Sequence, residues 1–142
     1  MQHFLSIPVG DHISFKIPNT WVEEVGDPGE YAFISGDGDV FMTVIFIGFD
    51  PSDTTSLKDI LEQATGTITE MADFTAPLVQ TEKYVARYIQ MGDQNMLFAM
   101  TEGFSEDSRI VANLFFKTED LEAYEKNRTL INQIIGAVEI KS

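Results

Sequence analysis

Residues 83–117 read KYVARYIQMGDQNMLFAMTEGFSEDSRIVANLFFK, which divides into three strand-like runs joined by short polar links. The runs cover about 83–91, 95–104 and 108–117, and the links are Gly92-Asp93 and Ser105-Glu106-Asp107. Links this short join antiparallel neighbours, because a parallel crossover needs about a dozen residues or more. This part of the chain therefore predicts an antiparallel sheet.

Two amphipathic segments flank these runs and predict two long helices. In the first, at about 56–72, Ser56 and Asp59 match a capping box, and apolar residues as far as Met71 fall on one stripe at helical spacing. The second, at about 119–138, begins with acidic residues that suit the positive end of a helix dipole. Its apolar residues also recur at helical spacing, so each helix has one face to bury.

The chain before the first helix adds more strands. Residues 3–8 and 12–17 read as a hairpin with Gly10-Asp11 at its turn, and a glycine-rich loop leads into the apolar run 40–48. The order of strands, helix, strands and helix predicts an α+β fold, in which a twisted, mainly antiparallel sheet is flanked by two long helices. The sequence has no repeat and no flexible linker, so we expect a single domain over residues 1–142.

Charge limits the classes of partner. The 142 residues include 23 acidic and 9 basic side chains, which gives a formal net charge of −14. Such a surface repels nucleic-acid phosphates and anionic lipid headgroups, because all of them are negatively charged. Proteins bind these groups through clusters of Lys and Arg. We expect no nucleic acid and no anionic membrane among the partners, whereas a basic protein or a metal cation is electrostatically compatible.

The chain contains no cysteine, which excludes disulfides, thiolate metal sites and a cysteine nucleophile. Its first residues, MQHFLSIPVGDHISF, lack the basic and apolar regions of a signal peptide, and no run of about 18 apolar residues could span a bilayer. We expect a cytoplasmic protein on these grounds. A chain whose export signal had been removed would have the same features.

A short motif adds a resemblance to a known fold. Residues Phe15-Lys16-Ile17-Pro18-Asn19-Thr20-Trp21 follow the pattern Phe-x-Ile-Pro-x-x-Trp, and the last predicted helix ends in Ile134-Ile135-Gly136-Ala137-Val138. Together with the order of strands and helices, this pattern resembles that of the PsbP-like superfamily. That group includes the photosystem accessory protein that names it, DcrB-like bacterial lipoproteins, and small bacterial chaperones that hold apolar segments of type VI secretion effectors.

The first two of these groups are exported, so the chaperone-like branch is the nearest analogy for a chain without an export signal or a cysteine to lipidate. The resemblance implies a noncatalytic, chaperone-like domain that binds a peptide or a protein segment. It assigns no binding residue, because fold does not determine function.

No group of reactive side chains indicates an enzyme. The two histidines, His3 and His12, both lie in the first hairpin, without a nucleophile motif nearby. Glu102 is the one carboxylate with apolar sequence surroundings, and we interpret it as a glutamate at a sheet end. We therefore predict no catalytic residue.

Four aspartates, Asp37, Asp39, Asp50 and Asp53, offer the oxygen ligands that Ca²⁺ prefers, but their spacing is not that of a calcium loop. We interpret them as turn residues and predict no metal site and no cofactor. Two alternatives to a binding domain stay open at this point. One is a small-molecule or metal-assisted enzyme, and the other is the subunit of a structural homodimer.

The division of strand residues into odd-numbered and even-numbered sets predicts the surface that contacts a partner. Successive side chains point to opposite faces of a sheet, and the even-numbered residues of the longest runs carry no charge. With the same parity in every strand, the even set packs on the helices and the odd set forms the second face. We predict that a partner binds this second face at Ile45, Ile89 and Phe115, with Thr43, Arg87, Thr101 and Asn113 as its polar points. The alternative is that a helix covers this face as well.

Overall fold

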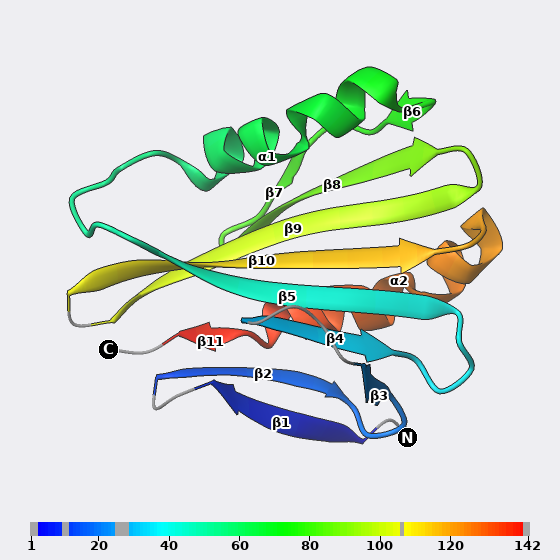
Figure 1. Cartoon of the computed structure of the whole chain (residues 1–142), viewed down its shortest axis with the longest axis horizontal. Helices are drawn as coiled ribbons and strands as arrows, with labels where there is room; N and C mark the ends of the chain where they lie inside the picture. The colour runs from blue at the N-terminus through cyan, green and yellow to red at the C-terminus, as the bar shows by residue number, and fades with distance from the viewer. Residues whose placement is uncertain (1–2, 10–11, 25–28, 106, 141–142) are drawn as a thin grey trace.

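A computed structural model describes residues 3–9, 12–24, 29–105 and 107–140 of the protein. The elements follow the chain in this order (Figure 1): β1 (Phe4–Val9), β2 (Ile13–Pro18), β3 (Val22–Glu24), β4 (Glu30–Ile34), β5 (Val40–Phe49), α1 (Leu57–Met71), β6 (Phe74–Thr75), β7 (Val79–Gln80), β8 (Tyr84–Met91), β9 (Gln94–Ser105), β10 (Ser108–Thr118), α2 (Leu121–Gly136) and β11 (Glu139–Ile140). Both long helices are where the sequence predicts them. The Gly10-Asp11 turn and Glu106 of the last link lie outside the described residues.

The strands form two sheets. The larger one has the strand order β3-β4-β5-β10-β9-β8-β6, with β7 also paired to β8, and the smaller one has the order β1-β2-β11. Every pairing between described strands is antiparallel. The prediction of an α+β fold with a mainly antiparallel sheet and two long helices is confirmed.

The two helices pack on opposite faces of the large sheet (Figure 1). Helix α2 lies with the small sheet against the inner face, where it contacts β10, β9 and β5, and it also contacts β2. Helix α1 packs on the outer face and contacts β8 and β9. Each helix begins at a side-chain cap, because Ser56 accepts a hydrogen bond from the Asp59 amide and Asp120 accepts one from the Ala123 amide.

The inner face holds the main core. Phe15, Ile17 and Trp21 of the N-terminal motif are buried there, together with Met42 and Val44 of β5. A smaller cluster on the outer face joins Leu61 of α1 to side chains of the sheet, which are Val85, Met100 and Val111. Phe15 of the Phe-x-Ile-Pro-x-x-Trp motif packs its ring against Tyr31, Phe33 and Phe46, so the motif joins the small sheet to the large one, and β11 adds a contact with β9.

The prediction of equal parity in every strand is wrong for β9. The tight turn at Gly92-Asp93 places Met91 opposite Gln94, so even-numbered residues of β9 share a face with odd-numbered residues of β8. Strand β10 is also paired to β9 with this shift, whereas β5 and β10 share the same parity. The outer face is thus made by odd residues of β5, β8 and β10 and by even residues of β9.

Candidate functional site

Part of the outer face has no helix over it. Helix α1 runs along the β8 side of the large sheet, and among the described elements none packs on the outer side of β4 or of the middle of β5 and β10 (Figure 1). We call this region the open face; its large or polar side chains are Ile34, Phe41, Thr43, Ile45, Ile47, Asn113 and Phe115.

Strand register sets the arrangement of the open face. Thr43 lies opposite Ala32 on one side and Phe115 on the other, and the next row places Ile45 between Glu30 and Asn113. Ile47 is 39% exposed, whereas Met42 and Val44, on the inner face of the same strand, are fully buried. The inner-face side chains of Val40, Met42 and Val44 are therefore dry, whereas the open-face side chains of the same strand are partly in water.

Aromatic rings and a few charges complete this surface. The rings of Phe98 and Phe115 lie 5.0 Å apart between their centroids, at an angle of 48°. The Lys117 ammonium lies 5.8 Å from the centroid of the Phe41 ring. On the β3 and β4 side, Glu24 and Glu30 follow the same rows across the sheet, so the margin there is acidic.

The seven predicted partner-binding residues are divided by the structure. Thr43, Ile45, Asn113 and Phe115 lie together on the open face. Ile89 is on the outer face but fully buried, so it is not available to a partner. Thr101 lies on the inner face, where its hydroxyl donates to the Lys83 carbonyl at 2.7 Å, and its place in the predicted set is wrong because of the shifted register of β9.

Arg87 is a special case among the predicted residues. It faces outward from β8 between the buried side chains of Val85 and Ile89, and it lies opposite Phe98. Its Nε atom is buried and has no hydrogen-bond partner, the one such side-chain nitrogen or oxygen found among the described residues. A buried donor without an acceptor costs about 1–3 kcal/mol, so an acceptor that reached Arg87 would be bound favourably.

Glu102 belongs to a structural ion pair. Its carboxylate accepts a hydrogen bond from Nε of Arg109, a side chain that is only 4% exposed. The same guanidinium donates from Nη1 to the Asp53 carbonyl at 3.1 Å and lies 5.9 Å from the centroid of the Phe49 ring. Arg109 therefore ties the loop before α1 to the outer face of the sheet.

Three of the aspartates that could have bound a cation form turns instead. Asp37 accepts hydrogen bonds from the Asp39 amide and the Ser35 hydroxyl, and these bonds lower its pKa. Asp50 accepts from the hydroxyl and amide of Ser52, and Asp53 from the amide and hydroxyl of Thr55, with the same effect on each pKa. Within the described residues, no three His, Asp or Glu side chains gather as metal ligands would.

A second concave region lies at the end of the sheet where β6 and β8 meet the start of α2. A cleft of about 350 Å³ is lined by side chains that are mainly apolar, namely Phe74, Tyr88, Gln90, Leu121, Tyr124 and Arg128. We call it the aromatic cleft. The rings of Tyr88 and Tyr124 lie 4.7 Å apart, and Phe74 lies 6.2 Å from Tyr88, measured between centroids. Burial raises the pKa of both tyrosines, so their hydroxyls stay protonated at neutral pH.

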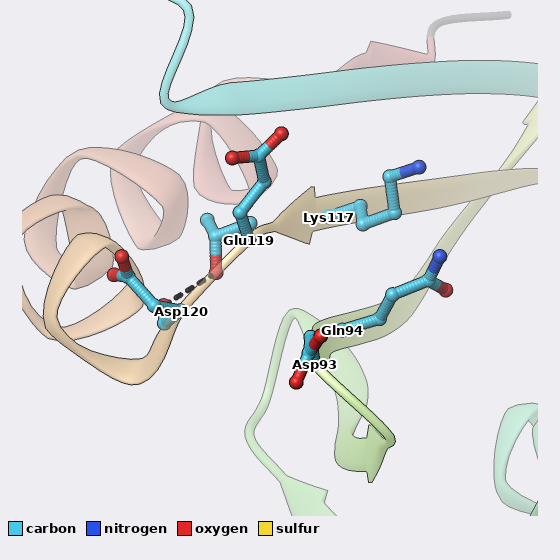
Figure 2. A pocket seen from close by; sticks show the side chains of 6 residues that line it. Asp93, Gln94, Lys117, Glu119 and Asp120 are labelled. Atoms are coloured by element: carbon cyan, nitrogen blue, oxygen red, sulfur yellow. Dashed lines mark hydrogen bonds between the residues drawn. The ribbon is translucent and has the colours of Figure 1, made fainter.

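Beside the cleft is a hollow with charged walls (Figure 2). It has a volume of about 570 Å³, with Asp93 and Gln94 on one side and Lys117, Thr118, Glu119 and Asp120 on the other. We call it the acidic hollow. The Thr118 hydroxyl donates to the Asp120 carbonyl at 3.1 Å, which fixes the connection between β10 and α2. Sequence analysis missed both regions.

No helix among the described residues is both long and apolar enough to cross a membrane. No protein-family model and no curated protein sequence matches the chain.

Solved structures do match, over nearly the whole chain. Cyanobacterial PsbP (CyanoP) from Synechocystis has a TM-score of 0.65 at 12% identity, covering 99% of this chain and 94% of that chain. The Ran-binding protein Mog1p of Saccharomyces cerevisiae has 0.63 at 10% identity, covering 99% and 96%. LpqN of Mycobacterium tuberculosis, which is involved in cell envelope biogenesis, has 0.62 at 14% identity, covering 99% and 92%. The protein therefore has the PsbP-like fold, as its N-terminal motif predicts, and these identities show the fold alone.

Proposed function

We propose that this protein is a noncatalytic cytoplasmic binding protein, chaperone-like in its role, whose open face holds a segment of another protein. The observation that carries the proposal is the partial exposure of Ile45, Ile47 and Phe115 on the outer side of strands whose inner-face residues Met42, Val44 and Leu114 are fully buried. Apolar surface costs about 25 cal/mol per Å² to leave in water, and a contiguous patch of it usually marks an interface. Mog1p, which has the same fold, is itself a protein-binding protein, since it binds Ran.

Charge favours a particular kind of segment. The chain carries a formal charge of −14, and Glu24 and Glu30 extend the rows of the open face toward its margin. Potentials of opposite sign steer partners together and fix their register. The proposed occupant is therefore a segment of a partner protein with apolar side chains for the floor and Lys or Arg at its flanks.

Polar groups on and beside the open face give the bound segment hydrogen-bond partners. Within the described residues, the side chains of Thr43 and Asn113 make no hydrogen bond, and the Nε atom of Arg87 has no acceptor. Carbonyl groups of an extended segment are suitable acceptors for Asn113 and Thr43, whereas the buried Nε atom of Arg87 could be reached only if neighbouring side chains moved. These contacts would set register, while Ile45 and Phe115 would supply most of the buried area.

A photocrosslinking experiment tests the proposal. Benzoylphenylalanine replaces Ile47 on the open face, and in a matched control it replaces Gln133, an exposed residue of α2 on the other side of the sheet. The proteins are irradiated in the cells that naturally produce them, and the adducts are identified by mass spectrometry.

The expected result is an adduct with a different polypeptide at position 47 and none at position 133. An adduct with a second copy of the chain would assign the open face to a homodimer. A small molecule, or no adduct at all, would contradict the proposal. Light scattering of the purified protein checks the homodimer independently.

A further inference from the structure

The aromatic cleft and the acidic hollow adjoin at the start of α2, and we call the two together the end surface. The cleft is lined from the inner face by Tyr88 and Tyr124, and the hollow from the outer face by Gln94 and Lys117. Asp120 lines the hollow and Leu121, the next residue, lines the cleft. On the other side, Gln90 lines the cleft and Asp93 lines the hollow from the same hairpin. The Asp73 carboxylate accepts a hydrogen bond from the Gly92 amide at 2.8 Å, which holds the strand of Phe74 against this hairpin. The two regions therefore keep fixed positions relative to each other.

The cleft is shaped for a large apolar group. Phe74 is 52% exposed and Leu121 is 54% exposed, although both belong to a cleft whose floor is the Tyr88–Tyr124 ring pair. Stacked or tilted aromatic neighbours favour an aromatic guest, because each such ring pair adds about 0.5–1.5 kcal/mol beyond the area that it buries. A ring or a branched aliphatic chain inserted here would remove water from both exposed side chains.

The walls of the cleft also carry unused hydrogen-bonding groups. Within the described residues, the Tyr124 hydroxyl and the Gln90 amide have no side-chain hydrogen bond, while the Tyr88 hydroxyl donates to Asn95. At the rim, Nη1 of Arg128 lies 3.8 Å from Oε2 of Glu125, and both side chains are largely exposed, so their charges offset each other. The cleft is thus electrically balanced and can bind the backbone of a peptide beside its anchoring side chain.

The charge of the hollow decides what lies next to that anchor. Asp93, Glu119 and Asp120 line the hollow with one cation, Lys117, whose ammonium lies over the Phe41 ring, and the Asp120 carboxylate also accepts the capping hydrogen bond from the Ala123 amide. None of these carboxylates forms an ion pair within the described residues. A cationic side chain placed here would gain attraction from three carboxylates, whereas an acidic one would be repelled.

We propose that the end surface binds a protein segment in which an aromatic or large aliphatic side chain is followed by Lys or Arg. The anchor enters the aromatic cleft and the basic residues lie in the acidic hollow. This contact borders the open face at Lys117, but its anchor site is distinct, since the cleft uses the edge at β6 and β8 and the start of α2. A partner long enough to reach both surfaces would bind more tightly through effective concentration.

The test uses short peptides and the full chain labelled with ¹⁵N. The probe is the blocked peptide Trp-Lys-Lys-Lys; Ala-Lys-Lys-Lys removes the anchor and Trp-Glu-Glu-Glu reverses the charge. We expect saturable amide shifts for Trp-Lys-Lys-Lys confined to residues 88–95 and 117–128. Each control peptide should bind at least about fivefold more weakly.

Two pairs of variants locate the site. Phe74→Ser should weaken Trp-Lys-Lys-Lys at least about fivefold, and Phe104→Ser, a control of 55% exposure on β9, should not. Asp93→Asn with Glu119→Gln should weaken it by about threefold or more, while Glu62→Gln on α1 should have no effect. Equal binding of the three peptides, shifts centred elsewhere, or shifts that depend on protein concentration and indicate self-association would overturn the proposal. The comparison of Phe74→Ser with Phe104→Ser does not depend on the open face, because neither residue belongs to it.

Discussion

Ile89 and Ile45 have the same side chain and lie on the same face of the same sheet, but their surroundings differ. Ile89 belongs to the half of the outer face beneath α1 and is fully buried, whereas Ile45 belongs to the open face and is partly in water. The difference arises from the path of the chain. The segment after β5 carries α1 to the β8 side, and β6 then pairs with β8, so the helix stays over that edge. One face of a sheet can thus be core in one half and free in the other.

The largest expected effect separates these two residues directly. Ile89→Ser removes buried methyl groups and places a hydroxyl in an apolar site, so it should lower the free energy of unfolding near the upper end of about 2–5 kcal/mol. Ile45→Ser, the matched control, should lower it by about 1 kcal/mol or less. Urea unfolding followed by circular dichroism measures both. Equal losses would mean that the open face is as much a part of the core as the covered half.

A second variant tests whether α1 is what separates the two halves. Leu61 is the fully buried residue through which α1 meets Val85, Met100 and Val111. Leu61→Ala should cost about 2–5 kcal/mol and increase amide exchange in β8 and β9 more than in β5. The exposed Ala64→Ser on the same helix is the control and should change little. Uniform loss of protection over the whole sheet would show that α1 is not a local cover.

The framework of the fold could be predicted from the sequence because its signals are local. The Gly92-Asp93 link implies an antiparallel pair, and Ser56 with apolar residues at helical spacing implies a helix, without any knowledge of distant contacts. The odd-numbered set correctly grouped Thr43 and Ile45 with Asn113 and Phe115, because odd residues of β5 pair with odd residues of β10.

What could not be predicted depends on how separate elements meet. The register shift of β9 moves Thr101 to the inner face, and the position of α1 buries Ile89; neither can be seen in side-chain periodicity. The end surface was missed for a similar reason. Phe74 belongs to a strand of two residues, and Tyr88 and Tyr124 come from distant parts of the chain. Only tertiary packing brings these rings together.

A smaller effect is expected at the Arg109–Glu102 ion pair, where the loop before α1 joins the sheet. Glu102→Gln removes the charge that faces a guanidinium only 4% exposed, so it should cost about 1–3 kcal/mol. The exposed Glu82→Gln serves as a control. Thermal melting measures the difference between them. A variant as stable as the parent would show that the Asp53 carbonyl and the Phe49 ring hold Arg109 without Glu102.

The smallest effect concerns pH and the same loop. Hydrogen bonds from Ser52 and Thr55 lower the pKa of Asp50 and Asp53 below the ordinary value of 3.8, so the folded protein favours their ionised forms. Their contribution to stability is therefore complete above that value and is lost as the pH falls through the lower folded values. The loop carries α1 over β8 and β9, so acid should increase amide exchange at Ser52 and Thr55 before it does so in β5.

The double variant Asp50→Asn and Asp53→Asn should reduce this pH dependence, whereas Asp107→Asn, outside the loop, should leave it unchanged. An identical acid response in all three proteins would mean that these turns do not control how α1 covers its half of the sheet.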